Sequence, residues 1–309
     1  MSGTWGPPHA KGKIICPIND AVLAEVMKQS DSFTRTKTAE LMDILSNGVV
    51  LKCSNERIEE EIIYSIKSRC GEQIERPMIW TIPAFVFGKI DKPRDIESFI
   101  QNNEQLSKLL YEKFYGITIV DVVSNTSIEK YDEFEQKAIE INEQSNENKQ
   151  DIRSLEKAYD IEFTGLMSLF VKKVKQCINE EPNKRICSIE EDKRPLWMIR
   201  NELYPSIHAA AMMHAHFRID FNRKMNGHDI FDIQIGASAL PYFDYFFTEK
   251  SLCSLINSSS FKRLSNYKCK VLASEKEILD SALTDAQPDR ATVARPSSGN
   301  SPWPKTPRK

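Results

Sequence analysis

Short blocks of hydrophobic and polar positions alternate along the chain and predict strands followed by helices. The apolar, β-branched or aromatic runs that favour strands are residues 13–18 (KIICPI), 49–51, 243–248 (FDYFFT) and 270–273 (KVLA). The segments with helical spacing are residues 21–29, 36–45, 203–223, 229–240, 249–256 and 274–283. Asn19 and Asp20 are candidate caps for the first helix, and Asn47-Gly48 is a stop signal after the second. This alternation is typical of an α/β fold.

The middle of the chain departs from this alternation. Residues 56–200 are charged and helical in composition, which predicts a large helical insert interrupted at prolines. Residues 116–123 (GITIVDVV) fit either a strand or the start of a buried helix, because periodicity does not discriminate at that length. Residues 285–309 are rich in Pro, Ser and Arg, and we expect them to be disordered.

Composition and charge exclude several classes of protein. With 40% hydrophobic and 28% charged residues over 309 positions, the chain is expected to be folded, helix-rich and soluble. A net charge of −2 provides no global basic field for nucleic acid or an anionic membrane. The seven cysteines are widely spaced without a C-x-x-C pair, so they favour neither a zinc site nor a disulfide framework and suit a reducing cytoplasm.

Two observations argue against export and membrane insertion. Residues 1–12 contain no apolar run of the kind found in a secretory signal. The most apolar stretch, residues 230–247, is broken by Asp232, Pro241 and Asp244, so it is not expected to span a membrane. We therefore expect a cytoplasmic protein without a membrane partner.

Acidic residues in apolar surroundings are the strongest candidates for chemistry. Glu25 lies beside the apolar stripe of its predicted helix, and Asp232 is placed in the first turn of another, where the helix dipole favours an anion. Asp244 and Glu249 stand at the start and the end of a short predicted strand. Grouped carboxylates are typical of sites that hold Mg²⁺ or Mn²⁺, which position phosphate oxygens and activate water. This pattern indicates metal-dependent phosphodiester hydrolysis.

Each acid also has a purely structural interpretation. Asp229 or Asp232 could be a helix cap, and Glu25 could be the partner of a lysine. Asp244 could be a turn former after Pro241, with Glu249 an ordinary first-turn acid. The spacing of His208, His214 and His216 does not favour a metal site, so core or surface positions are expected for them.

Three segments carry a resemblance to a known family. They are KIICPINDAVLAEVMKQSD, TAELMDILSNGVVL and HDIFDIQIGASALPYFDYFFTEKSL. Together they resemble the PIN-domain nuclease superfamily, in a PIN-like branch of uncharacterised bacterial proteins, over residues 11–51 and about 201–283. The most specific part is the C-terminal motif, in which an Asp opens a helix, Leu-Pro-Tyr breaks it, and an Asp precedes an aromatic strand.

The resemblance implies a fold, an activity and a set of site residues. The fold is a three-layer α/β arrangement around a parallel sheet, with a PIN-like core in two parts (residues 11–55 and 201–284) and the helical insert between them. The activity is hydrolysis of RNA by metal-activated water, with Mg²⁺ or Mn²⁺ as cofactor. The implied catalytic residues are Glu25, Asp232, Asp244 and Glu249, of which the first three are metal ligands, with Asp229 and Thr248 as auxiliary residues. RNA is the implied substrate, and a protein inhibitor or a second copy of the chain are further partners.

Two departures from the family pattern lead to an alternative function. Residues 1–12 contain no Asp or Glu, so the family's first strand and its terminal Asp have no counterpart. Ile235 also stands where the family branch has a histidine. The alternative is therefore a catalytically impaired or truncated PIN-like protein that acts as an RNA- or protein-binding module. A third interpretation makes the whole chain a helical scaffold.

Overall fold

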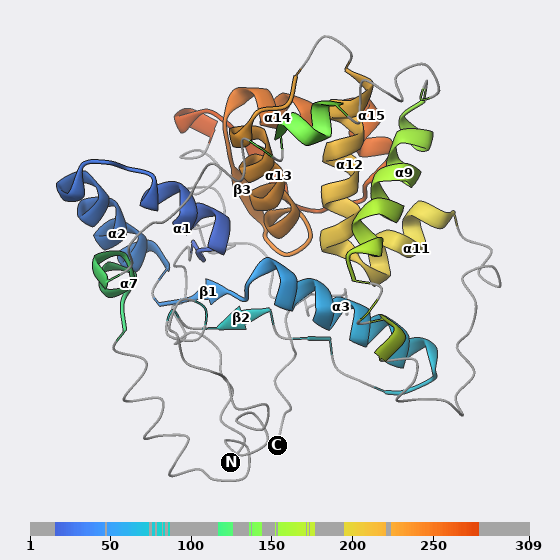
Figure 1. Ribbon diagram of the computed structural model, residues 1–309, viewed down its shortest axis with the longest axis horizontal. Helices are drawn as coiled ribbons and strands as arrows, with labels where there is room; N and C mark the ends of the chain where they lie inside the picture. Colours follow the sequence, from blue (N-terminus) through green and yellow to red (C-terminus); the bar gives the residue numbers. More distant parts are fainter. Residues whose placement is uncertain are drawn as a thin grey trace, which may run out of the picture.

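The computed structural model of this protein is built mainly of helices (Figure 1). It describes residues 16–46, 48–73, 117–125, 154–170, 195–220 and 224–277, with shorter stretches between 76 and 86, between 136 and 152, and between 172 and 176. The helices are α1 (Asp20–Met27), α2 (Ser32–Ser46), α3 (Ser54–Arg69), α7 (Ile119–Asn125), α9 (Leu155–Ser168), α11 (Leu196–Leu203), α12 (Pro205–Ile219), α13 (Gly227–Ala239), α14 (Lys250–Asn257) and α15 (Ser259–Leu264). The strands are β1 (Val50–Leu51), β2 (Trp80–Thr81), β3 (Tyr245–Phe247) and β4 (Lys270–Leu272).

The predicted three-layer α/β fold is wrong. Among the described residues, β1 and β2 form one antiparallel pair and β3 and β4 form one parallel pair, so no multistranded parallel sheet is present there. In the first apolar run, Ile18 makes a single parallel bridge to Val50. The apolar surface is buried mostly by helices packed on helices, which leaves only short strand pairs at their margins.

The main hydrophobic core surrounds α12, which contacts both α9 and α13. Ala209, Ala211 and Ala215 on α12 are fully buried, and so are Met212 and Met213. Small alanine side chains let neighbouring helix backbones approach closely, while the flexible methionines fill the remaining space. A smaller second core joins α1, α2, β1 and α7.

Local helix signals in the sequence are confirmed where the structure describes them. Asn19 is the N-cap of α1, and its side-chain Oδ1 accepts from the Val22 backbone N–H at 2.7 Å. Gly48 adopts a positive φ of 73° shortly after α2, as a stop signal requires. The ambiguous run at residues 116–123 contributes to helix α7, because the Asp43 carboxylate accepts from the Ile119 and Val120 amides at its first turn.

Other sequence expectations have different outcomes. The helix expected at residues 229–240 begins two residues earlier, because Asn226 caps α13 and Gly227 is its first residue. Much of the expected insert at residues 56–200, and all of the expected disordered tail at 285–309, lie outside the described residues. For the part of the chain that is described, none of the helices combines the length and apolarity needed to cross a membrane.

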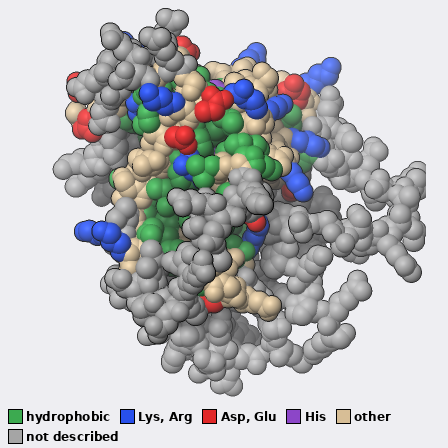
Figure 2. Space-filling view, turned by 90° about the vertical axis from the view of Figure 1, so that its right-hand side faces the viewer, with side chains coloured by type: hydrophobic (Ala, Val, Ile, Leu, Met, Phe, Trp, Pro, Cys, Tyr) green, Lys and Arg blue, Asp and Glu red, His purple; other side chains and the backbone are tan. Residues whose placement is uncertain are grey.

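The side of the molecule that carries α9 and α11 exposes apolar side chains. Figure 2 shows hydrophobic side chains in the middle of this side, with Lys, Arg, Asp and Glu around them. Exposed apolar residues of these two helices include Ile161, Leu196 and Met198, and Leu169 follows α9.

Candidate functional site

The candidate site begins at the N-terminal end of α13, which is fixed by a capping box. The Asn226 Oδ1 accepts from the Asp229 backbone N–H at 3.0 Å, and the Asp229 Oδ2 accepts from the Asn226 backbone N–H at 2.9 Å. This reciprocal pairing satisfies two backbone amides of the helix start. Asp229, expected as an auxiliary residue, is buried here and has a clear capping role.

Asp232 lies one turn further along α13 and is partly buried. Its pKa is raised to about 6, first by burial and then by the negative charges of Glu249, Asp229 and Glu25, while His228 acts in the opposite direction. These charges come from different elements: Glu25 from α1, Asp229 from α13 and Glu249 from the residue before α14. The structure therefore brings Glu25, Asp229, Asp232 and Glu249 into one electrostatic neighbourhood, which we call the acidic cluster.

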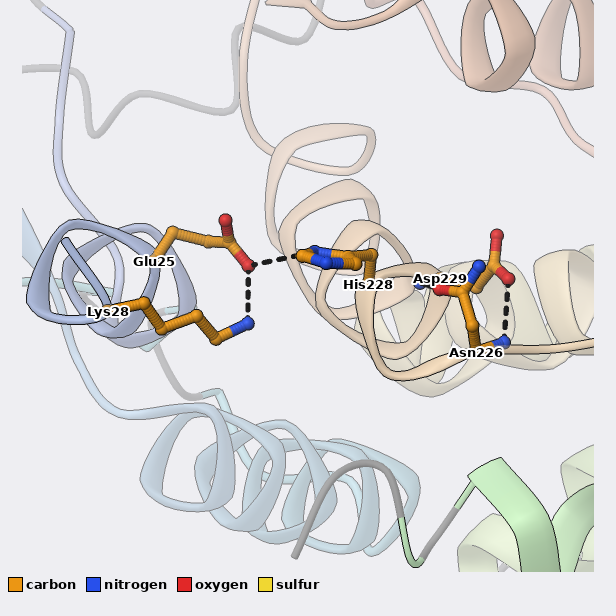
Figure 3. A network of polar contacts seen from close by, with 5 residues as sticks. All are labelled: Glu25, Lys28, Asn226, His228 and Asp229. Carbon is orange, nitrogen blue, oxygen red and sulfur yellow. Dashed lines mark hydrogen bonds and ion pairs between the residues drawn. The ribbon is translucent and has the colours of Figure 1, made fainter. Parts of the chain in front are cut away.

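Glu25 reaches the acidic cluster across the contact between α1 and α13. Its carboxylate lies 2.8 Å from the Lys28 Nζ on the same helix and 3.9 Å from the His228 Nδ1 on α13. Figure 3 shows the Glu25 carboxylate pointing toward the His228 ring, with Asp229 farther away beside Asn226. The Lys28 ammonium also lies 3.5 Å from the centre of the Phe231 ring, a cation–π contact that holds it next to α13.

Thr248 and Glu249 follow β3 in the sequence, and Glu249 belongs to the acidic cluster. The Thr248 backbone N–H donates to the Leu272 carbonyl at 3.0 Å, which fixes this turn to β4. Glu249 occupies the N-cap position of α14 without capping it through its side chain, and its carboxylate accepts from the Ser251 hydroxyl. Its charge is the largest neighbouring contribution to the raised pKa of Asp232.

Asp244 lies apart from the acidic cluster. It precedes β3 whereas Glu249 follows it, and five residues of extended chain span roughly 16 Å. The Asp244 carbonyl accepts from the Lys270 N–H at 2.9 Å, and its charge contributes, after burial, to raising the pKa of the Cys269 thiol to about 12. Asp244 does not contribute to the raised pKa of Asp232.

The distances within the acidic cluster limit how it can bind a metal. In the described part of the chain, no three His, Cys, Asp or Glu side chains are close enough together to hold one ion directly. A hydrated Mg²⁺ fits better, because this ion keeps several waters and binds to proteins through one or two carboxylates. Asp232 is the side chain on which these charges converge, with Glu249 as its strongest acidic neighbour and Glu25 as a weaker one.

Lys28 is the lysine partner that the structural interpretation of Glu25 allowed, but sequence reasoning missed His228 and one buried polar network. Lys28 and His228 flank Glu25, and the available signals were the i,i+3 spacing of Glu25 and Lys28 and the position of His228 directly before Asp229. The buried network contains Arg57 and Glu61 of α3, whose i,i+4 spacing ordinarily indicates a solvated pair.

Glu61 is the acid of this buried network. It is only 3% exposed, and it accepts from the Ser206 backbone N–H at 3.1 Å and from the Tyr242 hydroxyl. Burial raises the pKa of its carboxyl, while the hydrogen bonds and the Arg57 charge oppose that shift. This network has a structural role, because its members are enclosed among α3, α12 and α13.

His208 confirms the expectation of a core histidine. It is fully buried, with its Nε2 3.1 Å from the Leu264 carbonyl and its Nδ1 2.7 Å from the Tyr159 hydroxyl. Because a carbonyl only accepts, the proton is assigned to Nε2, and Nδ1 accepts from Tyr159. Burial lowers the His208 pKa to about 3, so the ring is neutral at physiological pH.

Comparisons with protein-family models, with curated proteins and with solved structures found no match to this chain. The functional argument therefore depends on the residues of the acidic cluster and their surroundings.

Proposed function

We propose that this protein binds a hydrated Mg²⁺ or Mn²⁺ ion at the acidic cluster and hydrolyses RNA phosphodiester bonds there. The observation that supports the proposal is the convergence on Asp232 of charges from Glu25, Asp229 and Glu249. Negative charges placed near Asp232 oppose its ionisation and are destabilising by themselves, and a cation removes that repulsion. Asp229 already caps α13, so Asp232, Glu25 and Glu249 carry the functional role.

The chain's own groups determine how the site would work. Asp232 would hold the ion from α13, and Glu249 at the N-cap of α14 and Glu25 of α1 would add negative charge around it. A bound divalent ion supplies charge stabilisation at phosphate oxygens and lowers the pKa of a coordinated water. His228, whose side chain is 74% exposed, and Lys28 can contact phosphate oxygens beside the carboxylates.

One observation favours a second candidate function, binding of RNA or protein without cleavage. The described residues lack a preformed set of three close metal ligands, and this absence is what an impaired site would show. In this second case Lys28 and His228 would hold α1 against α13 through Phe231 and Glu25, and the acidic cluster would not support hydrolysis. The same experiment decides between the two functions.

The test is Mn²⁺-dependent cleavage of a mixed single-stranded RNA pool by the wild-type protein and by Asp232→Asn. We expect cleavage by the wild type that falls at least about 100-fold in the variant, since a residue needed to hold the ion would be lost. Glu275→Gln is the matched control, because Glu275 is exposed and distant in sequence from the cluster. Asp244→Asn is also expected to keep the wild-type rate.

Folding of each variant is checked by circular dichroism and thermal unfolding. No cleavage by a folded wild-type protein in Mg²⁺ or Mn²⁺ would reject the nuclease proposal in favour of the binding function. Equal cleavage by wild type and Asp232→Asn would show that the acidic cluster is not the site.

A further inference from the structure

Helix α2 exposes an apolar face to solvent. Phe33, Leu41 and Ile44 are 69%, 53% and 75% exposed, respectively. The opposite face, with Ala39 and Met42, is buried against the smaller core. At 100° per residue, the exposed residues fall within about a quarter turn of one another, so they form a continuous stripe.

Two charged residues lie in the middle of this stripe. Lys37 and Glu40 have side chains that are 56% and 45% exposed, and the Lys37 Nζ lies 2.7 Å from the Glu40 Oε2. Because this pair is solvent-exposed, it contributes little to stability and can exchange partners at low cost. We call Phe33, Lys37, Glu40, Leu41 and Ile44 the α2 stripe.

The α2 stripe is complementary to itself in an antiparallel arrangement. A two-fold axis halfway between residues 38 and 39 places Phe33 opposite Ile44 of a second copy, because both are five and a half positions from the axis. The same axis places Lys37 opposite Glu40. An aromatic side chain then meets an aliphatic one at each end, and opposite charges meet on both sides of the centre, which is the pattern that an isologous interface requires.

The surroundings of α2 leave this face accessible. Its inner side contacts α1 and α7, and Asp43 on that side accepts from the first amides of α7 at 2.7 and 3.1 Å. Figure 1 shows α2 at the edge of the molecule, with the larger helical core beyond α1. A second copy can therefore approach α2 without displacing the helices that hold it.

We propose that the α2 stripe binds the same stripe of a second copy of this chain, with the two helices antiparallel across a two-fold axis. The charge pattern selects this partner, because an unrelated apolar helix would have no reason to match Lys37 and Glu40. One helix face is smaller than the ~800 Å² per partner of a typical stable interface. The dimer is therefore weak and its population depends on protein concentration.

The first experiment is sedimentation equilibrium of the full chain over a wide range of concentrations. We expect reversible dimerisation by the wild type and about a tenfold or greater loss of affinity in Ile44→Asp, which places a charge opposite Phe33. Lys172→Gln is the control, since it also lowers the net charge by one, at an exposed position outside α2. A wild-type protein that stays monomeric at millimolar concentration would overturn the proposal, and so would a dimer that Ile44→Asp leaves unchanged.

A second experiment uses charge reversal and does not depend on the hydrophobic contact. Lys37→Glu places like charges opposite each other in the homodimer, as does Glu40→Lys, so each variant alone is expected to dimerise about tenfold more weakly. Mixing the two variants restores opposite charges across the axis, so we expect a heterodimer that forms more readily than either homodimer. Failure of the mixture to associate better than its components would reject the antiparallel register.

Discussion

The Arg57 Nη2 donates to the Ser238 hydroxyl at 2.8 Å, although these residues lie 181 positions apart in the sequence. The same guanidinium donates to the Ser206 hydroxyl at 3.3 Å and to the Lys52 carbonyl at 3.1 Å. Arg57 is only 1% exposed, so its charge is enclosed by α3, α12 and α13 with Glu61 as the neighbouring acid. The arrangement fixes how α3, α12 and α13 meet, and α13 carries Asp229 and Asp232 of the acidic cluster.

Replacing Arg57 by Met tests this role. The variant leaves the buried Glu61 without its positive neighbour, so we expect a loss of about 3–5 kcal/mol in the free energy of unfolding. Urea denaturation measures the change, and Arg69→Met, at the end of the same helix, is the control. Adding Glu61→Gln to Arg57→Met should recover part of the loss, because the uncompensated acid is then neutral. Additive losses in the double variant would contradict the coupling.

Sequence patterns predicted the local structure better than the fold, and particular residues show why. The capping of α1 by Asn19, and the capping box of Ser274 and Glu277, involve groups at most three positions apart, so the pattern contains all the partners. The pairing of β3 with β4 instead depends on residues some 25 positions apart. A run such as residues 243–248 predicts an extended segment but not how many strands join it.

The candidate site was predictable in part. The sequence placed Glu25 beside an apolar stripe, and the structure places it in the acidic cluster. The expectation that Asp232 lies in the first turn of its helix is wrong, because α13 begins at Gly227 and Asp229 occupies that turn, although Asp232 is at the centre of the cluster. The separation of Asp244 from Glu249 follows from strand geometry alone, since the two residues flank one strand. The pairing of Lys28 with Glu25 is local to α1 and was predictable, whereas the contacts of His228 with Glu25 and of Lys28 with Phe231 depend on how α1 meets α13.

His208 makes stability depend on acid pH. Its pKa is about 3 in the folded chain and near 6.5 when unfolded, so between these values the unfolded chain binds more protons and stability falls as pH falls. By pH 4.5 this one group removes about 2–3 kcal/mol. We expect His208→Gln, which does not titrate, to show a shallower loss between pH 7 and 4.5 in urea denaturation. A His208→Gln variant with the wild-type slope would show that other groups cause the loss of stability in acid.

Two glycines in helices are expected to respond differently to alanine. A Cβ at Gly165 in α9 would meet no atom within 4 Å, so Gly165→Ala should stabilise the protein by about 0.5–1 kcal/mol through helix propensity. A Cβ at Gly236 in α13 would lie 2.8 Å from the Met213 Sδ, which is fully buried. Gly236→Ala should therefore destabilise by about 1 kcal/mol, because overcrowding exceeds the gain in propensity.

Thermal unfolding compares the two glycine variants. Combining Gly236→Ala with Met213→Ala provides the internal test, since removing the methionine side chain creates the missing space. In that background Gly236→Ala should become stabilising. A penalty that persists without the Met213 side chain would show that the crowding has another source.

Asp232 makes the folding stability depend on pH in the direction opposite to that of His208. Its pKa is about 6 in the folded chain against 3.8 for the ordinary carboxyl, so the folded state binds more protons between these values and stability falls as pH rises through them. The penalty is complete above pH 6 and absent below pH 3.8. Because Asp232 is only partly buried, solvent screening reduces the effect, and we expect Asp232→Asn to stabilise by about 1 kcal/mol at pH 7.5 and very little at pH 4.

At pH 7.5, divalent cations should make the wild type more stable than Asp232→Asn, which is the opposite of the order expected without them. Mg²⁺ or Mn²⁺ is expected to raise the melting temperature of the wild type by neutralising the repulsion between Asp232, Glu25 and Glu249, and to have little effect on Asp232→Asn. Asp244→Asn is the matched control, since its carboxylate lies outside the cluster and its removal should change neither the stability at pH 7.5 nor the response to the cation. A rise in melting temperature with the cation that Asp232→Asn retains in full would place the bound ion elsewhere on the protein. If Asp232→Asn instead stabilises the protein equally at every pH, the neighbouring charges do not oppose ionisation of Asp232.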